Sequence, residues 1–507
     1  MLLQQGCDPI RDMGFEKTIR GCFVMLLKHF FVEKIAHSSY IIAGKNACAV
    51  VDPQRDVDIY INEARAMGVE ITHILQTHLH ADFISGHMDL AEKTGARVHV
   101  AESARCTFEH VPLSEGDSFR IEDMVFEVLE TPGHTPEHLS YVVKDTSRSE
   151  SPIGVFVGDT LFVGDVGRPD LFPDMAGELA EKLYHSLHEK LMKLPDYTEV
   201  YPAHGAGSLC GRAMGSKWRT TIGYERNFNP ALQIGDKNDF IKSLTENMPP
   251  SPDHFSRCSD INRQGPLLLS KLPEMQELGP VQFIEKINKG NVAVLDARGY
   301  HAFAGQNLAG SWHLDLNGNF PTFAGWVMPT DRDILLIADD HKKAREANVW
   351  ARRVGVDRII GYLDGGMAAW AVSGLVSSHI ELISAEDLYG MISGKTDLVL
   401  LDVRTPLEFA ENHIEGAINI PASDLRTRYR ELDKSRKTVV LCSSGNRSSL
   451  GASILSQHGF AKVTNVAGGM TGYSAAGHIR ECKACVNPHG SRFFARFNEV
   501  PRRREIS

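Results

Sequence analysis

Cysteine is scarce in this chain, which has nine cysteines among 507 residues. That density is too low for a disulfide scaffold, and an odd number leaves at least one thiol unpaired within the chain. The sequence therefore predicts a reducing, cytoplasmic location, where individual cysteines become candidates for chemistry.

Long apolar runs are also missing. The segment that most resembles a targeting signal, residues 21–27, is too short for a membrane span or a signal peptide, and Lys28 and His29 follow it directly. The net charge of −10 provides no broad basic surface for nucleic acid or an anionic membrane. We therefore expect a soluble protein whose partners are small molecules, with neither nucleic acid nor a membrane among them.

The composition is that of a folded, multidomain chain. Hydrophobic residues make up 42% and charged residues 23% of the sequence, close to globular averages. At roughly 150 residues per domain, the length predicts about three domains. Met25 opens the first β-rich segment, so residues 1–24 are either an extension or the product of a misplaced start codon.

Residues 25–230 alternate short β-rich runs with helical stretches, a pattern typical of an α/β domain. Four motifs in this region place a histidine or an aspartate where an apolar strand meets a loop marked by glycine or proline. They are Thr77–His87, Thr131–Thr135, Val157–Leu161 and Tyr201–Gly205. Because loops at the edge of a rigid sheet bring such side chains together, the four motifs predict a metal site.

The order of these motifs resembles the metallo-β-lactamase superfamily, which implies an αββα sandwich. The last histidine of the superfamily motif HxHxDH is replaced here by Phe83. Phenylalanine cannot bind a metal, so we expect the second site of two-zinc relatives to be weak or empty. The sequence is then similar to the persulfide dioxygenases, and that resemblance implies a single Fe(II). The implied ligands are His78, His134 and Asp159, and the residues implied to support them are His80, Asp82 and His204.

Two further residues of this region are candidates for function. Arg168 lies in Gly164–Asp170, a segment that also resembles the persulfide dioxygenases. It is predicted to contact the thiol carrier or to organise the site, with a structural salt bridge as the alternative. Cys210 stands six residues past His204 and either relays sulfane sulfur or is a buried packing residue.

Residues 231–280 are rich in proline and are predicted as a linker. Beyond them the sequence repeats itself, since Val294–Arg298 corresponds to Leu400–Arg404 at an offset of 106. Further matches keep nearly the same offset, which predicts two copies of one α/β domain, residues 281–378 and 379–477.

The second copy carries a cysteine loop. Cys442 follows an apolar strand and precedes a helix, so its sulfur is expected among converging backbone N–H groups. The loop resembles that of the rhodanese family, because its six residues have the sulfurtransferase length, whereas related phosphatases have one residue more. The resemblance implies that Cys442 carries a persulfide. The residues implied to hold the anionic substrate are Ser443, Ser444, Gly445, Asn446 and Arg447.

The first copy lacks the cysteine and the arginine of this loop. Ala338 aligns with Cys442 and Lys343 with Arg447. We therefore interpret it as an inactive rhodanese-like domain used for packing, orientation or docking. In the tail, residues 478–507, a lone CxxC at Cys482 and Cys485 is not enough to predict a zinc site, and we expect a structural or disordered extension.

The domain order resembles persulfide dioxygenase–sulfurtransferase fusions. That resemblance implies oxidation of a low-molecular-weight thiol persulfide by O₂ to sulfite, and a rhodanese that forms or uses thiosulfate, in sulfide detoxification. A zinc thioester hydrolase of the glyoxalase II type with an attached sulfurtransferase is one alternative, and a sulfur carrier or sensor is another. Glutathione, coenzyme A and bacillithiol all remain open as the thiol carrier. A homo-oligomer is expected, with the number of subunits open.

Overall fold

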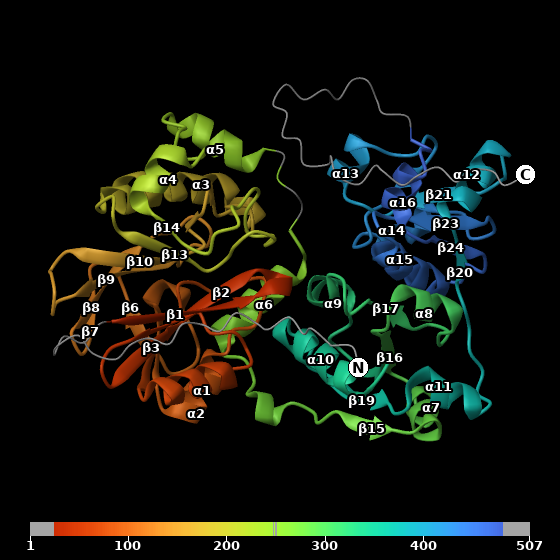
Figure 1. The fold of residues 1–507 in the computed structure, drawn as a ribbon, viewed down its shortest axis with the longest axis horizontal. Coiled ribbons are helices and arrows are strands. Elements are labelled where there is room, and N and C mark those ends of the chain that lie inside the picture. The colour runs from red at the N-terminus through yellow and green to blue at the C-terminus, as the bar shows by residue number, and fades with distance from the viewer. Residues whose placement is uncertain (1–24, 247, 249–250, 480–507) are drawn as a thin grey trace, which may run out of the picture.

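The computed structural model describes residues 25–246, 248 and 251–479. The predictions for residues 1–24 and for the CxxC pair lie outside these ranges. Figure 1 shows two lobes, one formed by the N-terminal half of the chain and one by the repeated domains. Among the described residues, no helix is both long and apolar enough to cross a membrane.

The first lobe contains two six-stranded sheets. One has the order β1-β2-β3-β4-β5-β6 and the other the order β14-β13-β10-β9-β8-β7. The strands of the first sheet are β1 (Leu26–Val32), β2 (His37–Ala43), β3 (Ala47–Val51), β4 (Glu70–Leu75), β5 (Arg97–Ala101) and β6 (Val111–Leu113). Those of the second are β7 (Ser118–Ile121), β8 (Met124–Glu130), β9 (Leu139–Asp145), β10 (Pro152–Gly158), β13 (Glu199–Pro202) and β14 (Thr220–Thr221), and a separate hairpin pairs β11 (Leu161–Phe162) with β12 (Asp165–Val166).

The two sheets pack face to face, and helices cover their outer sides. Tyr40 and Ile42 of β2 point into the core shared by both sheets, whereas Ile41 and Ala43 pack beneath α1 (Asp58–Met67) and α2 (His87–Thr94). Because side chains alternate across a strand, a strand that is apolar on both faces is buried from both sides. The second sheet is covered by α3 (Ala176–His185), α4 (Ile222–Phe228) and α5 (Lys237–Thr245). The predicted αββα sandwich is thereby confirmed.

The described residues of the stretch 231–280, predicted as a linker, include two α-helices, the 3-10 helix Leu269–Lys271 and a strand, Gln276–Leu278. Phe240 and Leu244, one turn apart on α5, are buried in the core of the first lobe. The second helix, α6 (His254–Gln264), carries Asn262, whose amide donates to the carbonyl oxygens of His80 and Phe83 at 2.8 and 2.9 Å. This part of the chain therefore supports the loop that carries the first motif.

The repeated domains have the same strand order. Their sheets run β15-β19-β18-β16-β17 and β20-β24-β23-β21-β22, with all strands parallel. The first copy comprises β15 (Gln276–Leu278), α7 (Pro280–Asn288), β16 (Val292–Asp296), α8 (Tyr300–Gly305), β17 (Trp312–His313), α9 (Phe320–Val327), β18 (Asp333–Ile337), α10 (His341–Arg353), β19 (Ile359–Leu363) and α11 (Gly366–Val372). The second comprises β20 (Glu381–Ile383), α12 (Ala385–Ser393), β21 (Val399–Asp402), α13 (Pro406–Glu411), β22 (Ile418–Asn419), α14 (Leu425–Arg428), β23 (Thr438–Leu441), α15 (Asn446–Gln457), β24 (Val463–Val466) and α16 (Gly469–Ala475).

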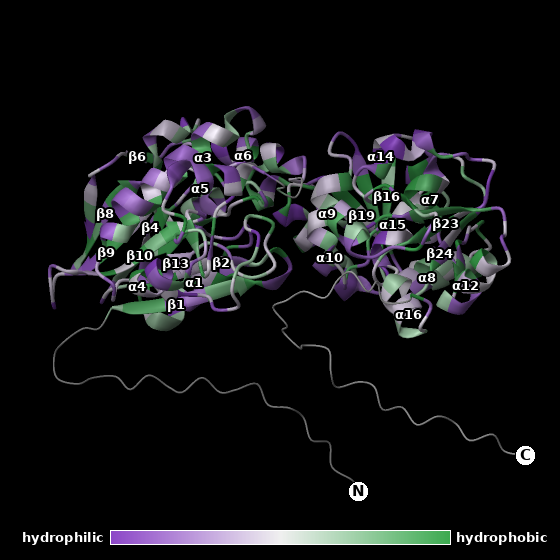
Figure 2. Ribbon diagram, turned by 90° about the horizontal axis from the view of Figure 1, so that it is seen from above, coloured by the Kyte–Doolittle hydropathy of each residue, from purple (hydrophilic) through white to green (hydrophobic). Residues whose placement is uncertain are grey.

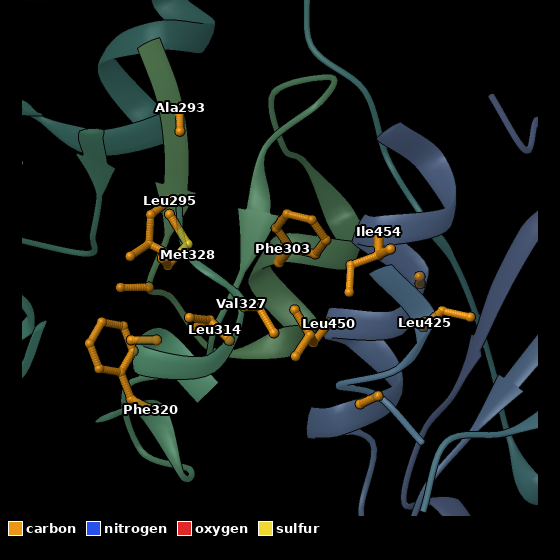
Figure 3. Packing of buried hydrophobic residues seen from close by; sticks show 14 of the residues in the cluster. Ala293, Leu295, Phe303, Leu314, Phe320, Val327, Met328, Leu425, Leu450 and Ile454 are labelled. Atoms are coloured by element: carbon orange, nitrogen blue, oxygen red, sulfur yellow. The ribbon is translucent and has the colours of Figure 1, made fainter. Parts of the chain in front are cut away.

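One hydrophobic cluster joins the two copies. Figure 3 shows Phe303 of the first copy beside Leu450 and Ile454 of α15, and all three belong to one buried cluster. Figure 2 shows the hydrophobic colour concentrated on the strands inside each lobe. Burial of apolar surface across the copies stabilises them as one body.

Ion pairs connect the first lobe to the first copy. The Arg55 guanidinium, which is buried, donates to the Asp357 carboxylate at 2.5 and 2.9 Å. Arg353 donates to both oxygens of Asp56 at 2.6 and 2.7 Å, and its carbonyl oxygen accepts from the Ile84 N–H at 2.7 Å. Because bidentate pairs fix orientation as well as distance, they set the position of the first copy beside the motif loop.

Candidate metal centre and sulfur-transfer loop

Three residues predicted as metal ligands lie together at one edge of the sandwich. His78 follows β4, His134 lies between β8 and β9, and Asp159 follows β10. One possible ligand atom from each lies within 4.8 Å of the others, and all three side chains are buried. The Asp159 Oδ2 atom is 3.3 Å from His134 Nε2 and 3.8 Å from His78 Nε2.

The Nε2 atoms of the two histidines fit a metal. Within the described part of the chain, neither atom has a hydrogen-bond partner, although both are buried. Buried ring nitrogens are normally bonded, and two that face one carboxylate are the donor set of a metal site. Burial lowers the pKa of both imidazoles, which keeps the rings neutral and their lone pairs free.

The other ring nitrogen of each histidine, Nδ1, forms a hydrogen bond. His134 Nδ1 is 2.9 Å from the Arg168 carbonyl oxygen, and His78 Nδ1 is 2.9 Å from the Thr77 hydroxyl. The Thr77 hydroxyl and N–H both donate to Asp52, each at 2.8 Å. Since a carbonyl oxygen can only accept, His134 carries its proton on Nδ1 and presents Nε2 as a ligand.

His204 joins two carboxylates beside this group. Its Nδ1 atom lies 2.8 and 2.9 Å from the two Asp159 oxygens, and its Nε2 atom lies 2.9 Å from Asp82 Oδ2. Burial alone would lower the pKa of His204, but the charges of Asp159 and Asp82 outweigh it and hold the pKa well above its ordinary value. The cationic ring in turn keeps Asp159 ionised.

A second group of possible ligands consists of Asp82, His204 and Cys210. Their ligand atoms also lie within 4.8 Å of one another. Phe83 is fully buried and packs its ring against His37 and His80, with centroids 4.1 and 4.5 Å apart. Cys210 thus supplies a possible donor beside Asp82 and His204, which the spacing of the sequence motifs did not indicate.

The Cys442 loop connects β23 to α15. The Gly445 N–H donates to Cys442 Sγ at 3.1 Å, and the Ser448 hydroxyl, which donates to Asn465 Oδ1 at 2.6 Å, lies 3.3 Å from the sulfur. Gly445 precedes the first residue of α15 and has a φ of 105°, a conformation that favours glycine. The loop thus directs a backbone N–H at the sulfur, which is a contact that stabilises negative charge on it.

Arg447 is held by Glu408. Its guanidinium donates to the two Glu408 oxygens at 2.7 and 2.6 Å and to the Ser443 hydroxyl at 2.7 Å. Burial opposes ionisation of Glu408, but the hydrogen bonds and charge of Arg447 prevail and lower its pKa to about 2. Ser444, Asn446 and Arg447 line a cavity of about 390 Å³ between the two copies.

Known protein families match both parts of the chain. The metallo-beta-lactamase superfamily model matches residues 33–204, and the rhodanese-like domain model matches residues 280–373 and 384–476. A solved metallo-beta-lactamase from Staphylococcus aureus subsp. aureus COL is 30% identical, with a TM-score of 0.60, and the match covers 67% of this chain and 98% of that one. This chain belongs to the metallo-β-lactamase superfamily. Two rhodanese-like domains follow its superfamily domain, as the sequence predicted.

Two curated relatives resemble the superfamily domain. Persulfide dioxygenase ETHE1, mitochondrial, of Mus musculus is 28% identical over 238 residues, which are 46% of this chain and 85% of that protein. Hydroxyacylglutathione hydrolase of Pseudomonas entomophila (strain L48) is 36% identical over 157 residues, which are 31% of this chain and 56% of that protein. One relative is named as a persulfide dioxygenase and the other as a hydroxyacylglutathione hydrolase, and the sequence does not decide between dioxygenase and hydrolase activity.

Arg168 of the superfamily domain is engaged on several sides. Its guanidinium donates to both oxygens of Asp170 at 2.7 Å and to the Leu209 carbonyl oxygen at 3.2 Å. Its N–H donates to the Cys210 carbonyl oxygen at 3.1 Å, and its own carbonyl oxygen holds His134. The pair with Asp170 is the salt bridge predicted as the alternative, and the hydrogen bond between His134 and the Arg168 carbonyl oxygen fits the organising role, which stays a prediction.

Cys210 is buried in the superfamily domain. Burial and then the charges of Asp82 and Asp159 raise its pKa well above the ordinary value, which favours the protonated thiol. The relay function stays a prediction, and the location of the thiol adds metal binding as a further possibility.

Sequence reasoning missed two supporting carboxylates. Asp52 follows β3 with a φ of 49°, an unusual conformation for a non-glycine residue, and lies 3.1 Å from His80 Nε2. Glu408 lies on α13 and pairs with Arg447. The aspartate at the end of an apolar strand was a signal for the first, but nothing near Glu408 indicated its partner.

Proposed function

We propose that this chain is a persulfide dioxygenase joined to a sulfurtransferase. The first reaction converts a thiol persulfide, O₂ and water to the thiol, sulfite and two protons. The second transfers the outer sulfur of a persulfide, through Cys442, to sulfite, which gives thiosulfate. The expected role is sulfide detoxification with a low-molecular-weight thiol as carrier.

The buried group of His78, His134 and Asp159 beside Phe83 is the observation that carries the proposal. Two imidazoles and one carboxylate are the donor set of non-haem Fe(II) oxygenases. When bound there, Fe(II) would supply the redox chemistry with O₂ that zinc lacks. The similarity to the persulfide dioxygenase of Mus musculus supports this choice of reaction.

The side chains of the site have distinct proposed tasks. Thr77 and the Arg168 carbonyl oxygen hold the two rings so that both Nε2 atoms face Asp159. His204 holds a proton between Asp159 and Asp82 and thereby fixes the orientation of both carboxylates. Phe83 places an apolar ring where the two-zinc relatives have a ligand.

The sulfurtransferase reaction needs no metal. The Cys442 sulfur bonds to the outer sulfur of a persulfide, the S–S bond of the carrier breaks, and its electron pair leaves with the carrier thiolate. The Gly445 N–H stabilises negative charge on Cys442 Sγ. Arg447 and the open end of α15 favour the anionic substrate.

A zinc thioester hydrolase is the second candidate for the first domain. The group of Asp82, His204 and Cys210 favours it, because two metals are the usual equipment of such hydrolases. The hydroxyacylglutathione hydrolase relative supports the same alternative.

Anaerobic purification, metal analysis and an oxygen electrode separate the two candidates. We expect one iron per chain and oxygen uptake with a thiol persulfide, matched by sulfite. His78→Ala should abolish both metal retention and oxygen uptake, while the control His185→Ala, at a half-exposed surface histidine, should keep both. Two zinc ions, thioester hydrolysis and no oxygen uptake would establish the hydrolase instead.

A further inference from the structure

Two cavities meet between the metal centre and the Cys442 loop. The larger one, about 390 Å³, contacts the loop through Ser444, Asn446 and Arg447. The smaller one, about 20 Å³, contacts Asp82 beside the metal centre. Leu209 and Thr322 line both cavities. A residue that supports the metal centre and the loop residues around Cys442 therefore border two neighbouring cavities that share these two side chains.

The inactive rhodanese copy builds one wall of this region. Its helix α9 carries Thr322 and contacts the short helix Glu33–Ile35 of the first lobe. Most residues that line the larger cavity belong to this copy, among them Asp315, Phe320, Thr322 and Trp326. The copy that lacks the nucleophile thus forms one wall of the larger cavity.

Leu209 occupies the narrow point. Its carbonyl oxygen accepts from Arg168, which fixes the backbone, whereas its side chain remains 42% exposed. The smaller cavity has room for about one water molecule. Rotation of the Leu209 side chain is therefore the motion that would widen the connection, because its backbone is held.

Cationic groups stand at both ends. Lys34, whose ammonium group donates to the Leu316 carbonyl oxygen, lines the smaller cavity, and Arg447, which is paired with Glu408, lines the larger one. Two carboxylates also face the space, but Asp82 is paired with His204, and Asp315 accepts from the Asn317 N–H at 2.9 Å. Paired or hydrogen-bonded carboxylates repel an anion less than free ones do, so the arrangement is compatible with passage of a small anion.

We propose that sulfite formed at the metal centre passes between Leu209 and Thr322 to the Cys442 persulfide faster than it escapes to the solvent. The proposal rests on the function proposed above. The sulfur lone pair of sulfite bonds to the outer sulfur of the persulfide, and the bond between that sulfur and Cys442 Sγ breaks. The electron pair of the broken bond stays on Sγ, so the products are thiosulfate and the Cys442 thiolate, and no oxidant is needed.

An isotope competition tests the passage in the full-length enzyme. Unlabelled glutathione persulfide and O₂ are turned over in an excess of isotopically labelled sulfite, and mass spectrometry reads the label in the sulfonate sulfur of thiosulfate. In the wild type we expect mostly unlabelled sulfonate sulfur. Leu209→Trp, which fills the narrow point, should raise the label toward the isotope ratio of the medium.

Two further variants control the experiment. Leu267→Trp changes a leucine that is 65% exposed and lines neither cavity, and it should keep the wild-type isotope ratio. Lys34→Gln removes one cationic end and should raise the label even if Leu209→Trp fails to fold. Circular dichroism and thermal unfolding check that each variant is folded.

The outcomes separate the passage from the function on which it rests. Wild-type thiosulfate with the isotope ratio of the medium would overturn the passage, while oxygen uptake and thiosulfate formation would still uphold the function. An unlabelled product from folded Leu209→Trp and Lys34→Gln would overturn the route between Leu209 and Thr322. Absence of oxygen uptake by the iron-loaded wild type would overturn both proposals.

Discussion

The two rhodanese-like copies share a scaffold and differ in one loop. Each has an arginine folded back onto an aspartate at the end of its second strand, Arg298 on Asp296 and Arg404 on Asp402, and both pairs have a shortest contact of 2.7 Å. The loops that follow β18 and β23 are different. The comparison teaches that this fold tolerates loss of its chemistry without loss of its architecture.

The difference lies at the start of the helix after the loop. In the active copy, Gly445 leaves its N–H directed at Cys442 Sγ. In the inactive copy, the Asp340 carboxylate accepts from the Lys343 N–H at 2.8 Å and caps α10. Because the capping carboxylate satisfies an N–H at the start of α10, the first copy differs from the second in a backbone donor as well as in the cysteine.

Removal of the nucleophile has the largest expected effect. Cys442→Ser should reduce thiosulfate formation to background, because serine cannot carry sulfane sulfur, while sulfite should still accumulate with a thiol persulfide and O₂. Ion chromatography measures both products. Cys106→Ser, which changes a partly buried cysteine far from the loop, should behave as the wild type. A folded Cys442→Ser protein that loses both activities would contradict the division of work between the domains.

Alanine substitutions at two equivalent glycines test how closely the backbone packs against each of the two loops. Gly469 and Gly366 occupy equivalent positions with φ of 52° and 57°. A Cβ at Gly469 would overlap the Cys442 carbonyl oxygen, whereas one at Gly366 would lie 3.0 Å from the Ala338 oxygen. Each alanine should cost about 1–2 kcal/mol of unfolding free energy for its backbone conformation.

Only Gly469→Ala should also lower sulfur transfer strongly, because its Cβ displaces the backbone of the nucleophile. Urea unfolding and the thiosulfate–cyanide assay measure the two effects. Equal losses of activity in both variants would mean that the copies are coupled through their shared core and not through the loop.

The sequence predicted most where a function is contained in a short segment. Cys442–Arg447 is contiguous, so its strand, loop and helix follow from local pattern, and the constant offset of the repeat identifies its partner copy. The three expected metal ligands lie in separate loops, yet the structure brings them together because each follows or precedes a strand of the same sandwich.

Contacts that depend on tertiary packing could not be predicted from the sequence pattern. Glu408 meets Arg447 across 39 positions of sequence, and Asn262 of α6 reaches back to the carbonyl oxygen of His80. Cys210 joins Asp82 and His204 only through the fold of its loop. Such pairs have no periodic or local signature, so physical reasoning from one sequence finds the scaffold and the motifs but not their supports.

The Glu408–Arg447 ion pair should make a moderate, pH-dependent contribution to the free energy of unfolding. Its folded pKa of about 2 lies below the ordinary value of 4.5, so the pair stabilises the protein above about pH 4.5 and this contribution is lost as the pH falls toward 2. The inactive copy has Ala302 and Lys343 at the equivalent positions.

Glu408→Gln should lower the unfolding free energy at neutral pH by up to about 1 kcal/mol, because both side chains are partly exposed. Between pH 4.5 and pH 2, the unfolding free energy of Glu408→Gln should then fall less steeply than that of the wild type. Urea unfolding across that range measures it, and Glu346→Gln, which removes the partner of Lys343 in the inactive copy, is the matched control. An unchanged acid profile in Glu408→Gln would show that the pair does not contribute to stability.

Restoring the missing cysteine should have the smallest effect of all. Ala338→Cys in a Cys442→Ser background places a thiol at the equivalent strand end, but we expect no sulfur transfer above background. Asp340 still caps α10, and the carboxylates of Asp339 and Asp340 repel an anionic substrate where the active loop has neutral residues. The thiosulfate–cyanide assay measures the outcome, and adding Asp340→Gly should allow a small gain by exposing the start of the helix. Activity of the Ala338→Cys protein without that second change would mean that the cysteine alone distinguishes the copies, and the electrostatic account of the inactive loop would be wrong.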